Sequence, residues 1–207
     1  RILSGSIMGE LFHPDDTEKI WKLCEDFRNG KPEIYSEIRK QYEENKYTWV
    51  SVEAKTMLDK QGKPSHVIGK ISNIDEKIKQ EQEMKYQMER DQLTGLYNKQ
   101  TVEKLISEKL AEGVGEDAYV VLTDVDEFKN INDTLGHLFG DGVLCTFANS
   151  MVELFPEAII GRSGGDEFIA FFDGLEQNDI LTRINRINRR LSRIHAGDND
   201  ELKISAS

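Results

Sequence analysis

The sequence predicts an α/β (α+β) fold with a partial antiparallel sheet, a connecting helix, and then a mixed central sheet flanked by helices. Strand-like runs follow one another between residues 33 and 74. A highly charged stretch without Gly or Pro occupies residues 75–90, and helical and strand-like patterns alternate from residue 91 onward. We therefore expect a first domain over 1–74, a linker helix over 75–90 and a second domain over 91–207.

The first domain begins with a turn, His13-Pro14-Asp15-Asp16, that leads into a helix. The apolar face of this helix consists of Ile20, Trp21, Leu23, Cys24 and Phe27. A break at residues 29–32, which read NGKP, ends the helix. Three strands follow, at Glu33 to Arg39, Tyr47 to Leu58 and Ser65 to Ile74, with a hairpin turn at residues 59–62.

The linker, from about Asp75 to Arg90, is charged and helix-favouring. Its irregular apolar stripe consists of Ile74, Ile78, Met84 and Met88. Two interpretations stay open from these residues, a solvated connecting helix and the stalk of a dimer in which two such helices pair.

The second domain alternates helices and strands. We expect helices around Val102 to Leu110, Val143 to Val152 and Ile180 to Ile194. We expect strands at Ala118 to Thr123, Ile159 to Arg162, Phe168 to Phe172 and Leu202 to Ser205.

The composition limits the range of functions. A formal net charge of −11 over 207 residues argues against bulk binding to DNA or RNA. No run approaches the roughly 18 apolar residues that span a bilayer, and no secretory signal opens the chain. Cys24 and Cys145 are expected to be free thiols rather than a disulfide. We expect the cytoplasmic portion of a longer protein, whose membrane anchoring stays open.

Two acidic clusters carry the chemistry. Asp124 and Asp126 follow the Ala118 strand, and Asp166-Glu167 follow the pair Gly164-Gly165. If the strand lies beside the glycine hairpin, these carboxylates meet at one end of the sheet. Mg²⁺ prefers carboxylate and carbonyl oxygens as ligands, and the bound ion is usually shared between the protein and substrate phosphates. The alternative is a polar hairpin tip together with a carboxylate that caps a helix.

Four ordered motifs carry a family resemblance. Residues 91–98 read DQLTGLYN, residues 124–129 read DVDEFK, residues 132–137 read NDTLGH with Gly140-Asp141 after them, and residues 164–168 read GGDEF. The second domain resembles the GGDEF family, the diguanylate cyclases. The first domain resembles the C-terminal part of a PAS sensor domain, through residues 13–16 and the strands after them.

The resemblance implies a palm-like second domain of ferredoxin-like order that lacks its C-terminal end. It implies a homodimer in which two GTP molecules condense into cyclic di-GMP with release of pyrophosphate, helped by Mg²⁺ (or Mn²⁺). It also implies metal ligands, namely Asp124, the Val125 carbonyl, Asp166 and Glu167, of which Asp166 and Glu167 are the catalytic pair.

Substrate contacts follow from the same resemblance. The backbone amides of Glu127, Phe128 and Lys129 would hold phosphates at a helix start. Asn132 and Asp141 would read the guanine edge. Further substrate contacts are expected from Gly164, Gly165 and Arg162. For Arg162, contact with a phosphate and pairing with a carboxylate both stay open.

Two departures from the family pattern matter. Phe155 and Ala158 stand where many members carry the Arg and Asp of a product-binding inhibitory site, so we expect no inhibition through that site. The family's last helix and strand, with a Lys and an Arg that contact phosphate, do not follow in this sequence. The activity of this piece by itself is therefore open.

Other functions remain open at this point. A non-catalytic domain that binds GTP or a partner protein is the alternative to a sensor-regulated cyclase, and a pure dimerisation module is a third. The signal of the PAS-like part does not follow from the residues.

Overall fold

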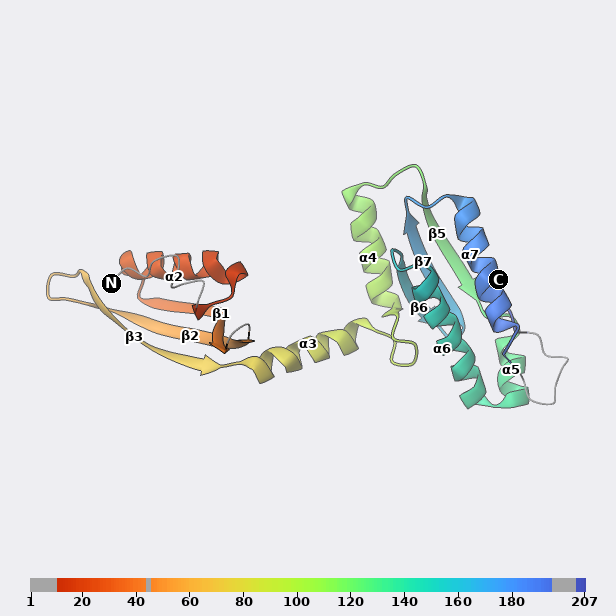
Figure 1. Ribbon diagram of the computed structural model, residues 1–207, viewed down its shortest axis with the longest axis horizontal. Coiled ribbons are helices and arrows are strands. Elements are labelled where there is room, and N and C mark those ends of the chain that lie inside the picture. Colours follow the sequence, from red (N-terminus) through yellow and green to blue (C-terminus); the bar gives the residue numbers. More distant parts are fainter. Residues whose placement is uncertain (1–10, 44–45, 195–203) are drawn as a thin grey trace. The chain divides into compact units, whose positions relative to one another are not determined.

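A computed structural model of the chain describes residues 11–43, 46–194 and 204–207 (Figure 1). The chain forms two compact units, residues 1–84 and 85–207, and the boundary lies inside α3 (Asp75–Glu89). An antiparallel sheet in the first unit and a mixed sheet flanked by helices in the second confirm the predicted fold class. The three-part domain division stays a prediction. Within the described residues, no helix combines the length and the apolar character that crossing a membrane requires.

The first unit is a helix packed on a three-stranded antiparallel sheet. The short helix η1 (Pro14–Asp16) leads into α2 (Thr17–Arg28), and the strands β1 (Glu33–Glu43), β2 (Lys46–Leu58) and β3 (Pro64–Asn73) follow in that spatial order. Ile20 of α2 packs against Ile38 and Val50 of the sheet. The predicted helix, strands and hairpin are confirmed, and β1 extends four residues beyond the predicted end at Arg39 to Glu43.

A buried carboxylate fixes the start of this unit. Asp16 is 1% exposed, and its carboxylate accepts hydrogen bonds from the Arg39 backbone amide at 2.8 Å and from Arg39 Nε at 2.9 Å. Burial by itself raises the pKa of the Asp16 carboxyl, but the hydrogen bonds and the charge of Arg39 outweigh it and hold that pKa below its ordinary value of 3.8. The ionised pair therefore ties η1 to β1.

The linker helix α3 has no buried residue. Asp75 at its start accepts a hydrogen bond from the Trp49 backbone amide at 2.7 Å, and ion pairs one turn apart join Lys77 to Glu81 and Lys85 to Glu89. The predicted helix is confirmed. Its pairing with a second chain stays a prediction.

The second unit has helices on both faces of a four-stranded sheet (Figure 1). The strands β4 (Tyr97–Asn98), β5 (Ala118–Asp124), β6 (Ile159–Gly164) and β7 (Glu167–Asp173) lie in the order β4-β6-β7-β5. β4 is parallel to β6 and the other pairs are antiparallel. β4 was not predicted, because two residues show no alternation. α4 (Lys99–Glu112) covers one face, where Val102 and Ile106 pack on Phe171.

The other face carries the larger core. It is covered by α5 (Phe128–Leu135), α6 (His137–Leu154) and α7 (Gln177–Leu191). The ring of Phe147 lies 4.7 Å from that of Phe168, and the ring of Phe155 lies 4.7 Å from that of Phe172. The predicted helices of this unit are confirmed.

The end of the chain lies along β5. Ala206 forms an antiparallel bridge with Val125, and Asp124 and Ser207 exchange backbone hydrogen bonds of 3.0 and 3.1 Å. The strand predicted at Leu202 to Ser205 falls largely outside the described residues. Among those that are described, the pairing is at Ala206, beyond its predicted end.

We predict that Asp16→Asn lowers the free energy of unfolding of the first unit by about 3 kcal/mol, because removing one charge leaves Arg39 without its buried partner. Both tryptophans of the chain, Trp21 and Trp49, lie in this unit, so urea unfolding followed by tryptophan fluorescence measures it directly. Glu33→Gln is the matched control, since the Glu33–Lys55 pair is exposed and contributes about 0–1 kcal/mol.

The same carboxylate gives a pH dependence. Its pKa is lower in the folded than in the unfolded chain, so its contribution is complete above about pH 4 and is lost as the pH falls through the depressed folded pKa. The wild type should therefore lose more stability than Asp16→Asn on acidification. Parallel pH curves for the two proteins would contradict this account.

Candidate functional site

A tight hairpin presents the first acidic pair. β6 and β7 pair Gly164 with Glu167, so the loop between them consists of Gly165 and Asp166. Gly165 has a φ of 51°, a left-handed conformation that costs little only for glycine. Asp166 thus lies in the loop and Glu167 is the first residue of β7. β6 extends to Gly164, two residues beyond its predicted end at Arg162, and its register with β7 shifts between these two residues.

The second acidic motif ends the neighbouring strand. β5 pairs with β7 in a register that sets Asp124 opposite Glu167. The Val125 amide donates to the Asp166 carbonyl at 3.3 Å, which continues the pairing past the strand end. Side chains directly opposite each other on antiparallel strands have Cβ atoms about 5 Å apart. The expected meeting of the two motifs at one end of the sheet is confirmed.

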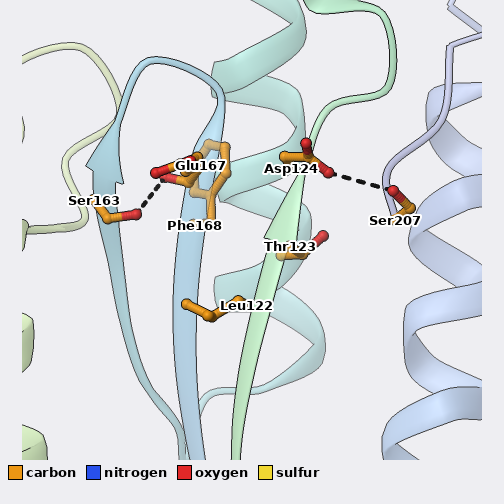
Figure 2. A pocket seen from close by; sticks show the side chains of 7 residues that line it. All are labelled: Leu122, Thr123, Asp124, Ser163, Glu167, Phe168 and Ser207. Carbon is orange, nitrogen blue, oxygen red and sulfur yellow. Dashed lines mark hydrogen bonds between the residues drawn. The ribbon is translucent and has the colours of Figure 1, made fainter.

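A pocket of about 250 Å³ opens at this place, and Figure 2 shows its lining. Asp124 and Glu167 lie on adjacent strands, with the Asp124 carboxylate directed to Ser207, whose hydroxyl donates to it at 3.3 Å. The Ser163 hydroxyl donates to the Glu167 backbone carbonyl at 3.3 Å. Outside the pocket lining, the Ser205 hydroxyl donates to the Asp126 carboxylate.

The oxygen atoms at this end of the sheet suit a hard cation that also binds the phosphates of a ligand. In the described part of the chain, no group of three or more His, Cys, Asp or Glu side chains is arranged to hold a metal ion. Asp124 and Glu167 are paired in register, and Mg²⁺ commonly binds through one or two carboxylates together with substrate phosphates. The ligand roles of Asp124, Val125, Asp166 and Glu167 stay predictions.

A helix start without a side-chain cap lies just after the acidic strand end. Glu127, the residue before α5, has a φ of 49°, and among the described residues it is the one non-glycine with positive φ. Such strain is typical of functional sites. No side chain caps α5, so its first amides are available to an anion. This matches the predicted phosphate contacts of Glu127, Phe128 and Lys129.

Asn132 lies at the contact between α5 and α6. A Cβ on Gly140 would lie 2.0 Å from Asn132 Oδ1 and 3.2 Å from Phe128 Cε2, so the missing side chain makes room for the amide. Asn132 Oδ1 is buried and has no hydrogen-bond partner. A buried acceptor without a partner costs about 1–3 kcal/mol, and a ligand N–H pairs with it only when neighbouring groups move, because the atom is inaccessible to solvent here. Asp141 is the next residue of α6 and is half-buried.

Arg162 faces protein acceptors. Its Nη1 donates to Asp91 Oδ1 at 3.1 Å, and its Nε donates to the Gly165 carbonyl at 2.8 Å. The carboxylate pairing left open by the sequence thus has its partner, Asp91. Partial burial raises the pKa of the Asp91 carboxyl, but hydrogen bonds from Thr94 and Arg162 outweigh this effect and leave that pKa below 3.8. The predicted phosphate contact of Arg162 stays a prediction.

Phe155 and Ala158, which stand where many family members carry the Arg and Asp of an inhibitory site, differ in burial. Phe155 is fully buried against Phe172, with the Arg183 guanidinium 5.4 Å from its ring centroid. Ala158 is half-buried.

Sequence reasoning missed three contributors to the site. Ser205 and Ser207 bind the carboxylates of Asp126 and Asp124, but small polar residues at the end of a sequence give no signal of a partner eighty residues away. Gly140 was part of a quoted motif without a role. Its position directly before Asp141 was the available signal.

Proteins with curated names match the second unit in sequence. DgcC of Escherichia coli K12, named a probable diguanylate cyclase, is 29% identical over 121 residues, which is 57% of this chain and 33% of that protein. PdeR of the same strain, named a cyclic di-GMP phosphodiesterase, is 30% identical over 121 residues, 58% of this chain and 18% of that protein. The chain thus spans a third or less of the length of these relatives.

Solved structures share the fold. The GGDEF domain of DgcB from Caulobacter crescentus, solved with c-di-GMP, is 26% identical over 57% of this chain and 74% of that one, with a TM-score of 0.51. A DgcB structure that includes its coiled coil gives a TM-score of 0.58 at 22% identity, over 65% of this chain and 74% of that one. Residues 88–207 match the family model "Diguanylate cyclase, GGDEF domain", and the chain belongs to this family.

Proposed function

We propose that this chain is the catalytic part of a diguanylate cyclase, which condenses two GTP molecules into cyclic di-GMP as a homodimer. The observation that carries the proposal is the pairing of β5 with β7, which sets Asp124 opposite Glu167 beside the glycine hairpin. The uncapped start of α5 offers backbone amides to the triphosphate, and Asn132 Oδ1 offers a hydrogen-bond acceptor to the base.

Each half-reaction is a displacement at phosphorus. The 3′-oxygen of one GTP forms a bond to the α-phosphorus of the other, the bond to the β-phosphate oxygen breaks, and pyrophosphate leaves. Glu167 accepts the hydroxyl proton at its carboxylate. Asp124, Asp166, Glu167 and the Val125 carbonyl would hold Mg²⁺ or Mn²⁺, which would supply electrostatic stabilisation of the phosphates. Because two substrates face each other, two copies of the chain are required.

Guanine selection is assigned to the contact between α5 and α6. The unpartnered Asn132 Oδ1 accepts from the exocyclic amine, and Asp141 accepts from the N1–H and the amine. Adenine has neither an N1–H nor an amine at C2, so it leaves these acceptors unpaired. The site therefore selects GTP over ATP.

The first unit is proposed to be a sensor of the PAS type that controls the catalytic unit. The support is its arrangement of one helix and an antiparallel sheet, with α3 continuing from it as one helix. A second candidate function is a non-catalytic domain that binds GTP, because PdeR matches this chain but is named for a phosphodiesterase activity and not for synthesis of cyclic di-GMP.

We predict that Glu167→Gln lowers the rate of cyclic di-GMP formation at least about 10²-fold, since loss of a general base typically has this effect. GTP binding should change less than about threefold, because the proposed base contacts, Asn132 and Asp141, lie on α5 and α6 and not on β7. Product analysis after incubation of the full-length protein with GTP and Mg²⁺ measures the rate. Glu108→Gln, an exposed carboxylate on α4, is the control.

Wild-type binding of GTP without any cyclic product would favour the non-catalytic alternative. Full turnover in Glu167→Gln would refute the assigned base.

We predict that Gly140→Ala weakens GTP binding about tenfold, or ~1.4 kcal/mol, because the new Cβ displaces the Asn132 amide from its place. ATP binding should not change, so selectivity falls. Gly142→Ala is the matched control on the same helix, since nothing lies within 4 Å of its added Cβ. It should keep GTP binding and gain about 0.5–1 kcal/mol of stability. Equal GTP affinities in the two variants would contradict the guanine assignment.

A further inference from the structure

We propose that Arg162 is a positioning residue for the reaction, and that the turn at residues 90–98 ties it to the last turn of α3. In this arrangement the linker helix and the glycine hairpin are mechanically coupled within one unit. The inference rests on the proposed function for its catalytic consequence, but its structural part has a separate test.

The first link joins Arg162 to the hairpin loop. Arg162 Nε and Nη2 both donate to the Gly165 carbonyl, the former at 2.8 Å. Gly165 precedes Asp166, whose own carbonyl accepts the Val125 amide. The Arg162 side chain is 13% exposed, so its guanidinium is held in place by the protein. Moving it therefore moves the loop that carries the acidic pair.

The second link joins Arg162 to a closed turn. Asp91 Oδ1 accepts from Arg162 Nη1 at 3.1 Å, from the Thr94 amide at 2.9 Å and from the Thr94 hydroxyl at 2.7 Å. The Asp91 amide donates to the Leu96 carbonyl at 2.8 Å, and the Gly95 amide donates back to the Asp91 carbonyl at 2.9 Å. One carboxylate thus holds both the turn and the guanidinium.

The third link joins this turn to α3. Asn98 Nδ2 donates to the Met88 carbonyl in the last turn of α3 at 2.6 Å, while its Oδ1 accepts from the Thr101 amide at the start of α4. Arg90 Nη1 donates to the Gly95 carbonyl at 3.1 Å, and its guanidinium lies 3.9 Å from the ring centroid of Tyr97. β4 sets Asn98 beside Arg162 of β6. The path from Met88 to Gly165 is therefore continuous.

The path has a functional consequence. A displacement of about 1 Å of a catalytic group costs on the order of 10²-fold in rate. A change in the last turn of α3 is passed through Asn98 and the turn to Arg162, and so to the acidic pair. A measured interaction between the two ends of the path is therefore the test of this coupling.

The experiment uses two conservative variants of the full-length protein. Arg162→Lys keeps the charge but not the fork that spans Gly165 and Asp91. Asn98→Asp keeps the acceptor for Thr101 and removes the donor to Met88. Arg183→Lys is the matched control, because Arg183 also bridges a carbonyl and a carboxylate, Leu154 and Glu157, away from the hairpin.

We expect Arg162→Lys to lower kcat about 10²-fold with KM for GTP changed less than about threefold. Amide hydrogen exchange of Val125, whose acceptor is the Asp166 carbonyl, should be about tenfold faster in the absence of nucleotide. Asn98→Asp should shift both readouts in the same direction by a smaller factor. The double variant should resemble Arg162→Lys alone, since both changes act on one path. Arg183→Lys should move neither readout.

Unchanged Val125 exchange in Arg162→Lys would overturn the positioning role, whatever the enzyme does. Strictly additive effects of Asn98→Asp and Arg162→Lys would overturn the coupling. If the wild type forms no cyclic di-GMP while the exchange differences appear, the coupling stands and the proposed function falls.

Discussion

The antiparallel register of β5 and β7 is the constraint on which the rest of the site depends. It sets Asp124 opposite Glu167 and lets the Val125 amide reach the Asp166 carbonyl. A shift of β7 by one residue would turn the Glu167 carboxylate to the face of the sheet opposite Asp124. The aromatic core under β7 prevents such a shift, because Phe168 and Phe172 are fully buried against α6 and against Phe155 at its C-terminal end. Packing energy in the core thereby determines the geometry of the acidic residues.

Much of the fold followed from the sequence. The helices and the main strands have strong periodicity in the sequence. The Gly164-Gly165 pair predicts a turn, and Gly165 has a positive φ in the hairpin loop. The meeting of Asp124 with the hairpin was predicted on the condition that the Ala118 strand lies beside the hairpin, and the pairing of β5 with β7 fulfils this condition. Membership of the family supports the reaction proposed above.

Other features were beyond sequence reasoning for physical reasons. β4 has two residues and its pairing depends on Arg162 and Gly161 sixty residues later. The partner of Arg162 was left open, because a charge pattern does not say which carboxylate a guanidinium meets in space. Gly140 was not given a role, since the space that it leaves for Asn132 exists only when α5 and α6 are packed. These three features depend on contacts between segments that are distant in the sequence, which periodicity and motifs do not reveal.

The most direct test of the account is a crystal structure of the full-length protein with Mn²⁺ and a non-hydrolysable GTP analogue, in which anomalous scattering locates the metal. The account predicts an ion bound by oxygens of Asp124 and of the Asp166-Glu167 pair and by the phosphates, with the base next to Asn132. An ion bound by the phosphates alone, away from the end of β5, would contradict it.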